Sequence, residues 1–287
     1  RYWCDLPAGH SSPDILAKEY VNFASPYGIT YKVFGEAEII ELGMGGVEGV
    51  CRGSDHELRF VIAEYKTDPK NQTLVLVGKG VTFDSGGLSI KPANSMETMK
   101  DDMAGSAVVN AVMNVIGQLK PKNINVIAIA PLVENMPSGK AIRPGDVLKF
   151  YNGKTAEVKN TDAEGRLILA DALSYAAKNY NPNYIIDLAT LTGACAAALG
   201  PIYAGLFSEH EDIAKMIEES AKHSGDKVWR LPTHEDYKVA IRSEIADICN
   251  IGSPKYMSGA TTAAYFLQNF VGDIPWAHLD IAGVAFD

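Results

Sequence analysis

The chain of 287 residues is 47% hydrophobic and 21% charged, which is ordinary for a globular protein large enough to bury a substantial core. Its net charge is -9, its pI is about 5.2 and its positive residues are scattered, so nucleic acid and anionic lipid are not expected as main partners. Apolar stretches stay shorter than the roughly 18 to 20 residues of a membrane span, so we expect a soluble protein, without membrane association, that acts on a small substrate.

Predicted strands alternate with predicted helices along the chain. Continuous apolar runs indicate strands covered on both faces, and they occupy residues 58–65, 73–78, 124–132, 184–191 and 276–283. Helical periodicity or composition marks residues 13–25, 103–116, 167–177, 211–222 and 258–271. The helix over 167–177 is apolar nearly all round and should be buried. This alternation predicts an α/β fold, with a mixed, largely parallel central sheet sandwiched between helices in three layers.

No internal repeat and no Pro/Gly/Ser linker divides the sequence. We therefore expect residues 1–287 to form a single domain, on which residues 1 to about 55 pack as a leading segment. The first 20 residues lack the basic start, apolar run and cleavage site of a signal peptide. Because the chain opens with Arg1 rather than a methionine, we expect it to begin inside a longer polypeptide.

Three short strings carry candidate chemistry, and the first is "GKGVTFDSGGLSIK" (78–91). It places Lys79 and Asp84 just after an apolar strand, in a loop that contains several glycines. Loops at the carboxyl ends of sheet strands are where α/β proteins bind ligands. The alternative is a phosphate-binding glycine loop, but the string matches neither GxxxxGK[ST] nor GxGxxG.

The second string, "KDDMAG" (100–105), puts Asp101 and Asp102 before a helix that is predicted to begin near Met103. A structural alternative is strong here, because acidic side chains at helix starts are stabilised by the helix dipole.

In the third string, "NTDAEGRL" (160–167), Asn160, Asp162, Glu164 and Arg166 alternate with small or neutral residues. If the segment is extended, a period of two places all four side chains on one face of a single cavity. A helix start is equally compatible, with Asp162 as the cap and Glu164 in the first turn.

The coincidence of the three strings predicts a metal site. If the four carboxylates converge, their mutual repulsion would cost many kcal/mol without cations to neutralise it. These residues are Asp84, Asp102, Asp162 and Glu164. A carboxylate-dominated site suits magnesium, manganese, zinc or cobalt, and a bridging carboxylate is typical of two ions about 3 to 4 Å apart.

Other metal or nucleophile signatures are missing from the sequence. The six histidines form no HExxH motif, and no GxSxG elbow is present, so a histidine-rich zinc site and covalent serine catalysis are not expected. The cysteines are far apart and form no CxxC pair, which predicts buried thiols in a reducing compartment, and therefore a cytoplasmic protein. They are Cys4, Cys51, Cys195 and Cys249.

The strings "VGKGVTFDSGGLSIK", "MKDDMAG", "PLVENMPSGKAIRPGDV", "NTDAEGRLILADAL", "DLATLTGA" and "WAHLDIAG" resemble, in order from about Leu58 to Gly283, the leucyl aminopeptidase (cytosol aminopeptidase) family of dinuclear metallopeptidases. The resemblance implies hydrolysis of the N-terminal residue of peptides through a metal-bridging water, with leucine or methionine preferred. It implies two divalent ions per chain, zinc or manganese, with magnesium or cobalt as alternatives. It also implies a homo-hexamer, and we expect the N-terminal domain and the final helix that the family usually has to lie outside this sequence.

The same resemblance assigns roles to individual residues. The implied ligands of one metal are Lys79, Asp84, Asp102 and Glu164, and those of the other are Asp84, Asp162 and Glu164. As a ligand Lys79 must be neutral, whereas Lys91 stays protonated and stabilises the oxyanion. Arg166 is implied to hold a bicarbonate ion as proton relay. The implied pocket for the substrate's first side chain comprises Met99, Thr190, Gly193 and Ala260.

Two other functions are compatible with parts of the sequence. Carboxylates and divalent ions also serve phosphoesterases, although the glycine loop is not a phosphate-binding motif and the chain is acidic. A non-catalytic assembly or DNA-binding subunit would need a basic face on the oligomer.

Overall fold

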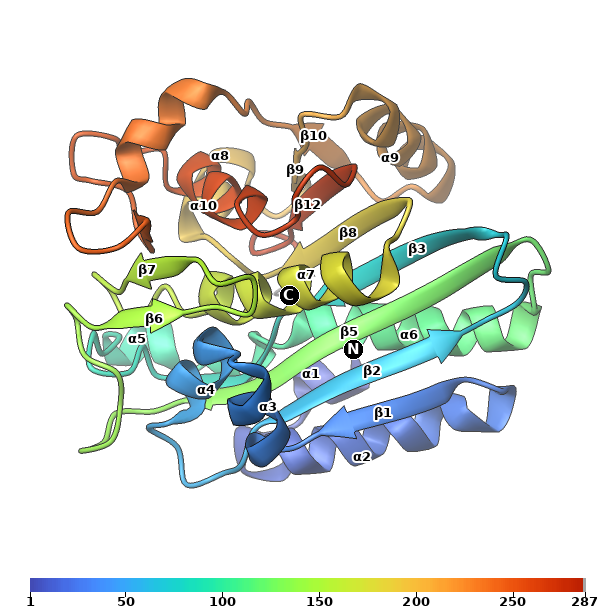
Figure 1. Ribbon diagram of the computed structural model, residues 1–287, viewed down its shortest axis with the longest axis horizontal. Coiled ribbons are helices and arrows are strands. Elements are labelled where there is room, and N and C mark those ends of the chain that lie inside the picture. The colour runs from blue at the N-terminus through green and yellow to red at the C-terminus, as the bar shows by residue number, and fades with distance from the viewer. Residues whose placement is uncertain (286–287) are drawn as a thin grey trace.

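The computed structural model describes residues 1–285, which form a large twisted sheet with helices on both faces (Figure 1). The strands lie in the order β1 (Thr30–Phe34), β2 (Arg59–Tyr65), β5 (Ile124–Asn135), β3 (Gln72–Gly78), β8 (Tyr184–Ala189), β12 (Trp276–Asp280), β9 (Ala204–Phe207) and β10 (Val228–Arg230). The central strands β5, β3, β8 and β12 run parallel to one another. Antiparallel pairs join β1 to β2, β2 to β5 and β9 to β12.

Helices cover both faces of this sheet (Figure 1). The core on one face contains side chains of α3 (Glu36–Leu42), α4 (Gly45–Cys51), α7 (Gly165–Tyr180), α8 (Gly193–Leu199) and α10 (Gly259–Gln268). The other face is covered by α1 (Tyr2–Asp5), α2 (Pro13–Ala24), α6 (Ala104–Leu119) and α9 (Glu211–Ser224). A small sheet of β6 (Val147–Lys149), β7 (Thr155–Glu157) and β11 (Ile248–Cys249) lies beside the main one.

Short helical turns complete the chain. They are η1 (Ala8–His10), η2 (Ser25–Tyr27), α5 (Ala93–Met96), η3 (Met99–Asp101) and η4 (Glu235–Ile241).

The predicted fold class is confirmed, since each of the five predicted strands and five predicted helices overlaps an observed element, with both ends within three residues of the observed ones. Helix α7 is buried at every position from 165 to 176, as predicted for a sequence over 167–177 that is apolar nearly all round. The leading segment was expected only to pack on the domain, but it also contributes a strand to the sheet, because β1 pairs with β2.

The prediction that Lys79 to Asp84 belong to a loop is wrong in part, because Gly80–Asp84 forms strand β4. Strand β5 continues beyond the end of β3, and β4 pairs with this extension, from Gly80 beside Leu132 to Asp84 beside Asn135. The free backbone groups of the longer neighbour therefore impose a strand on a sequence that reads locally as a loop.

Three of the cysteines are buried free thiols, and Cys4 is a half-buried one. In residues 1–285 we find no helix with the length and apolarity needed to cross a bilayer.

Candidate active site

The candidate site lies at the edge of the sheet where the parallel strands end. Lys79 occupies the break between β3 and β4, and Asp84 is the last residue of β4. The backbone N–H of Lys79 donates to the carbonyl of Leu188 (3.0 Å), and its carbonyl accepts from the N–H of Ser106 (2.8 Å). Ligands of α/β proteins usually bind at the carboxyl ends of the strands. Here the backbone of Lys79 holds β8 and the start of α6 next to those strand ends through its two hydrogen bonds.

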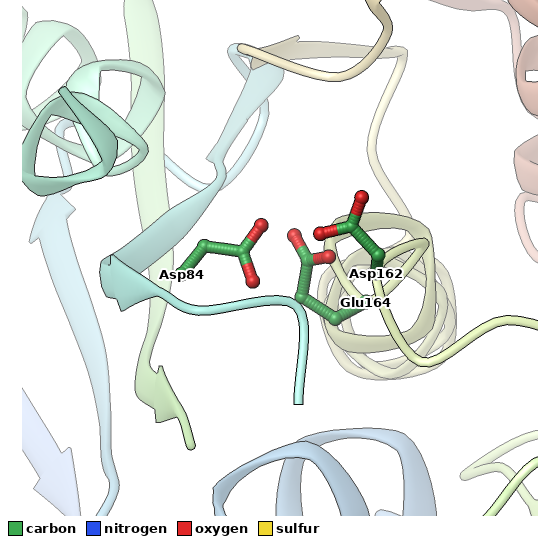
Figure 2. Close-up of side chains that lie close together, drawn as sticks. All are labelled: Asp84, Asp162 and Glu164. Atoms are coloured by element: carbon green, nitrogen blue, oxygen red, sulfur yellow. The ribbon is translucent and has the colours of Figure 1, made fainter. Parts of the chain in front are cut away.

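Three carboxylates converge at this edge, as Figure 2 shows. Oxygen atoms of Asp84, Asp162 and Glu164 all lie within 4.8 Å of one another. Asp84 comes from the end of β4, and the other two come from the turn that leads into α7. Burial, followed by repulsion from Glu164, raises the pKa of Asp84, and burial raises the pKa of Asp162. The protein thus places these carboxyl groups where burial disfavours their charged form.

Neither local interpretation of residues 160–166 is correct. The segment is not extended, because it turns at Asn160, whose carbonyl accepts from the N–H of Ala163 (3.3 Å). Helix α7 begins at Gly165 with Glu164 at the N-cap position, yet the Glu164 side chain makes no capping hydrogen bond within the described chain. Asp162 is therefore not the cap, and Arg166 lies on the first helical turn. The carboxylates converge through this turn rather than through a shared strand face.

The side chain of Lys79 links a fourth carboxylate to the group. Its Nζ lies 2.7 Å from Oδ1 of Asp102 and 2.9 Å from Oε1 of Glu164, and it donates to the carbonyl of Thr190 (2.9 Å). Burial acts to lower the pKa of Lys79, but the two carboxylates outweigh burial and raise it. Lys79 is thus an ammonium group between two acids here.

Asp102 does not serve the start of α6, which begins at Ala104 and has no acidic residue in its first turn. Its Oδ1 instead accepts from Oγ1 of Thr190 (2.8 Å) as well as from Lys79. Burial raises the pKa of Asp102 well above its ordinary value. The helix-start alternative for this residue is therefore wrong.

Lys91 pairs with two carboxylates of the group, Asp84 and Asp162. Its Nζ lies 2.9 Å from Oδ2 of Asp84 and 2.5 Å from Oδ1 of Asp162. Burial would lower the pKa of Lys91, but the neighbouring acids raise it. The loop that carries it turns at Gly86, whose φ is +87° and where a Cβ atom would lie 2.8 Å from Oδ1 of Asp162. Only glycine leaves room for this approach.

Arg166 is buried in the first turn of α7. Its Nη1 donates to the carbonyl of Asn250 (2.7 Å), and Nε has no hydrogen-bond partner among residues 1–285. Burial lowers the pKa of Arg166 to about 10, so the group stays charged at neutral pH.

Amide and hydroxyl side chains that the sequence analysis missed hold these loops together. Nδ2 of Asn135 donates to Oδ1 of Asp84 (2.8 Å) and to the carbonyl of Thr161 (3.1 Å). Oγ1 of Thr161 donates to the carbonyl of Gly86 (2.6 Å). Asn250 accepts from the N–H of Lys159 (2.8 Å) through Oδ1. Asn135 follows a predicted buried strand and lies in the string "PLVENMPSGKAIRPGDV", and these two signals could have identified it.

Of the four residues expected to line a substrate pocket, three lie on helices and Thr190 lies in the segment that follows β8. Thr190 is buried between Lys79 and Asp102, and Met99 is half-buried on η3. Gly193 starts α8 and Ala260 lies in the first turn of α10. A Cβ atom on Gly259 would lie 3.1 Å from the Cβ of Ala194, so the two helix starts are adjacent.

A separate cavity of about 710 Å³ lies on the face of the sheet covered by α1 and α6, and its lining contains none of the predicted site residues.

The donor set fits divalent cations. Four carboxylates face two ammonium groups, which leaves negative charge uncompensated. Oδ2 of Asp102 and Oε2 of Glu164 are buried without a hydrogen-bond partner in the described part of the chain. Buried anionic oxygens without donors are costly, and cations are the natural partners for them.

Comparison with known proteins agrees with this chemistry. The profile of the cytosol aminopeptidase family, catalytic domain, matches residues 1–287. The chain is 50% identical over 284 residues to a probable cytosol aminopeptidase of Chlorobaculum tepidum, covering 98% of the chain and 56% of that protein. It is 48% identical over 285 residues to a probable cytosol aminopeptidase of Rickettsia felis (98% of the chain, 57% of that protein). The chain is also 48% identical over 282 residues to the cytosol aminopeptidase of Rickettsia prowazekii, covering 97% of the chain and 56% of that protein.

The chain thus spans little more than half the length of these relatives. The match nevertheless covers the whole sequence, including every residue of the carboxylate and lysine cluster. The chain therefore belongs to the cytosol aminopeptidase family and corresponds to its catalytic domain.

Proposed function

We propose that the protein is a metal-dependent aminopeptidase that removes the N-terminal residue, leucine or methionine by preference, from peptides. The observation that carries the proposal is the group of carboxylates from Asp84, Asp162 and Glu164 within 4.8 Å, flanked by two lysines. Family membership supports peptide hydrolysis over phosphoester hydrolysis and over a non-catalytic role.

Two divalent ions, zinc or manganese, would be held by the cluster, with magnesium or cobalt as alternatives. We assign one to Lys79, Asp84, Asp102 and Glu164, and the other to Asp84, Asp162 and Glu164. Ions bound there would supply Lewis-acid polarisation of the scissile carbonyl and an activated bridging water. Lys79 would have to give up its proton to act as a ligand. Because its Nζ is buried between Asp102 and Glu164, the positive charge lost with that proton would have to be replaced by the charge of the metal ion.

Lys91 and Arg166 carry the proposed catalytic roles. Lys91 keeps its proton, because Asp84 and Asp162 stabilise the ammonium form, and it can donate a hydrogen bond to a developing oxyanion. Arg166 is a buried cation at the start of α7, suited to hold a bicarbonate ion as proton relay. In this assignment every carboxylate of the cluster contacts a lysine or would bind a metal ion. No carboxylate of that group is therefore free to act as a general base.

Around the cluster, Met99, Thr190, Gly193 and Ala260 would form the pocket for the first side chain of the substrate. Their small or apolar side chains favour leucine or methionine over charged residues. Action in the cytoplasm and assembly into a homo-hexamer are part of the same proposal.

The test compares hydrolysis of leucine p-nitroanilide and of p-nitrophenyl phosphate by the protein supplied with Mn²⁺ or Zn²⁺. We expect activity on the anilide alone, lost on chelation, and two ions per chain by metal analysis. Asp84→Asn should lose both the ions and the activity, whereas Asp273→Asn, at an exposed position, should lose neither. Activity on the phosphate alone, or full activity of Asp84→Asn, would overturn the proposal.

A further inference from the structure

Asp280, the last residue of β12, is a fully buried acid that does not belong to the carboxylate cluster. Its Oδ1 accepts from the backbone N–H groups of Leu191 (3.2 Å), Thr192 (3.4 Å) and Ala282 (3.2 Å). Its Oδ2 accepts from Oγ1 of Thr192 (2.7 Å). A buried carboxylate is costly without such donors. Because two of these residues follow β8, Asp280 fastens the segment after β8 to the end of β12.

The hydroxyl of Thr192 also holds the start of α8. It donates to Asp280 and accepts from the N–H of Cys195 (3.0 Å), which is the N-cap contact of that helix. A hydroxyl has a single proton, so its donation to Asp280 leaves its lone pairs free for the helix. Gly193, the first residue of α8, is exposed, and a Cβ atom built on it would meet nothing within 4 Å. The two contacts thus fix a residue that borders open space.

The same segment is bound at its other end to the carboxylate and lysine cluster. The carbonyl of Thr190 accepts from Nζ of Lys79 (2.9 Å), and its Oγ1 donates to Asp102 (2.8 Å). Residues 190–193 therefore connect the cluster to the start of α8, with Thr190 held by the cluster and Thr192 held by Asp280. Because Thr190 has its own contacts, loss of the contact to Asp280 should release the helix start and leave Lys79 and Asp102 in place.

We propose that Asp280 is a positioning residue for substrate specificity, which acts through Thr192 to fix Gly193 in the wall of the pocket for the substrate's first side chain. The inference rests on the proposed function, in which Gly193 lines that pocket. A pocket discriminates between apolar side chains of different size by close contact, so a displaced wall lowers selectivity. A purely structural role would reduce stability and leave selectivity unchanged.

The kinetic test measures kcat/KM for leucine p-nitroanilide and for alanine p-nitroanilide in the protein supplied with Mn²⁺. Asp280→Asn replaces one of the two acceptor oxygens by a donor and keeps the capping hydroxyl of Thr192. We expect the leucine-to-alanine ratio of kcat/KM to fall by about 10-fold with metal content unchanged. Thr192→Val, which lacks the hydroxyl, should lower the ratio by a similar factor, and the double variant should lower it no further. Thr192→Ser should keep the ratio of the original protein.

Asp247→Asn is the matched control. Oδ2 of Asp247 accepts from the N–H and from Oγ1 of Thr155 (both 2.8 Å), so this variant removes the same kind of contact in the small sheet. Its selectivity should be unchanged. An unchanged ratio in Asp280→Asn, or an equal fall in Asp247→Asn, would overturn the inference. If Asp280→Asn does not fold, equal ratios for Thr192→Val and Thr192→Ser would overturn it.

Hydrogen exchange gives a second readout that needs no activity. The amide hydrogens of residues 191–195 should exchange at least 10-fold faster in Asp280→Asn than in the original protein, because the start of α8 loses a contact that holds it. Absence of peptidase activity in the original protein would count against the proposed function alone. In that case unchanged exchange in Asp280→Asn would still contradict the positioning role.

Discussion

Gly165 leaves the space that the side chain of Lys79 occupies. A Cβ atom built on Gly165 would lie 2.8 Å from Nζ of Lys79. Glycine within a helix is unfavourable by roughly 1 kcal/mol relative to alanine. At this position the glycine destabilises the helix but leaves room for the ammonium group of Lys79.

We expect Gly165→Ala to displace Lys79 from Asp102 and Glu164 and to weaken metal binding by at least 10-fold, because ligand orientation is lost. Titration with Mn²⁺ measures this. Gly139→Ala is the matched control, since a Cβ atom there meets nothing within 4 Å. An unchanged metal affinity in Gly165→Ala would show that Lys79 adjusts freely.

Lys91→Ala should lower kcat by roughly 10²-fold or more while the protein keeps its metals, because Lys91 contributes a hydrogen bond to the oxyanion rather than a metal ligand. Steady-state kinetics with metal analysis on the same sample separates the two effects. Lys140→Ala, at an exposed position, should leave both quantities unchanged. Loss of metal from Lys91→Ala would mean that the lysine holds Asp84 and Asp162 in place instead.

Asn135→Ala should reduce metal affinity by roughly 10- to 100-fold, the usual effect of removing a partner that orients a ligand. The variant loses the hydrogen bond to Asp84 and the link to Thr161. Asn125 lies near the other end of β5 and binds the backbone at Thr67 and Asp68, so Asn125→Ala should reduce stability alone. Equal metal affinities for the two variants would disprove an orienting role for Asn135.

Asp171 provides a prediction about stability and pH. Its carboxyl group accepts from the N–H groups of Gly46 (2.7 Å), Val47 (3.0 Å) and Tyr151 (2.8 Å) beneath α7. Burial raises the pKa of Asp171 from its ordinary value of 3.8 to about 7. Between these values the folded state holds a proton that the unfolded state has released, so the contribution of Asp171 to stability falls as pH rises from about 4 to about 7.

Asp171→Asn removes both this proton and one of the two acceptor oxygens. The variant should be less stable by about 1–3 kcal/mol at pH 7, with a larger deficit at pH 5. Urea unfolding at the two pH values measures the difference. Equal deficits at the two pH values would show that Asp171 is ionised throughout this range.

The sequence predicts the central strands and main helices well because their apolar runs and periodicity are long. It fails where a neighbour decides the local structure. Strand β4 exists because β5 extends past β3, and residues 160–164 turn because Thr161 is bonded to the loop at Gly86. Such contacts join positions that are far apart in the chain, so no local pattern reveals them. The carboxylates were identified by their coincidence in three strings. Asn135 lies in a string that carries the family resemblance but was given no role, and Asn250 lies outside all of these strings.

The loops at the site are fastened to one another by the neutral groups of Asn135, Thr161 and Asn250. Hydrogen bonds between uncharged partners do not depend on ionic strength as charge pairs do. The frame should therefore keep its shape in high salt while the charges inside it are screened. Because the loops do not depend on the charges for their shape, replacing one divalent ion by another of different size should move only the side chains that bind it and leave the surrounding backbone folded.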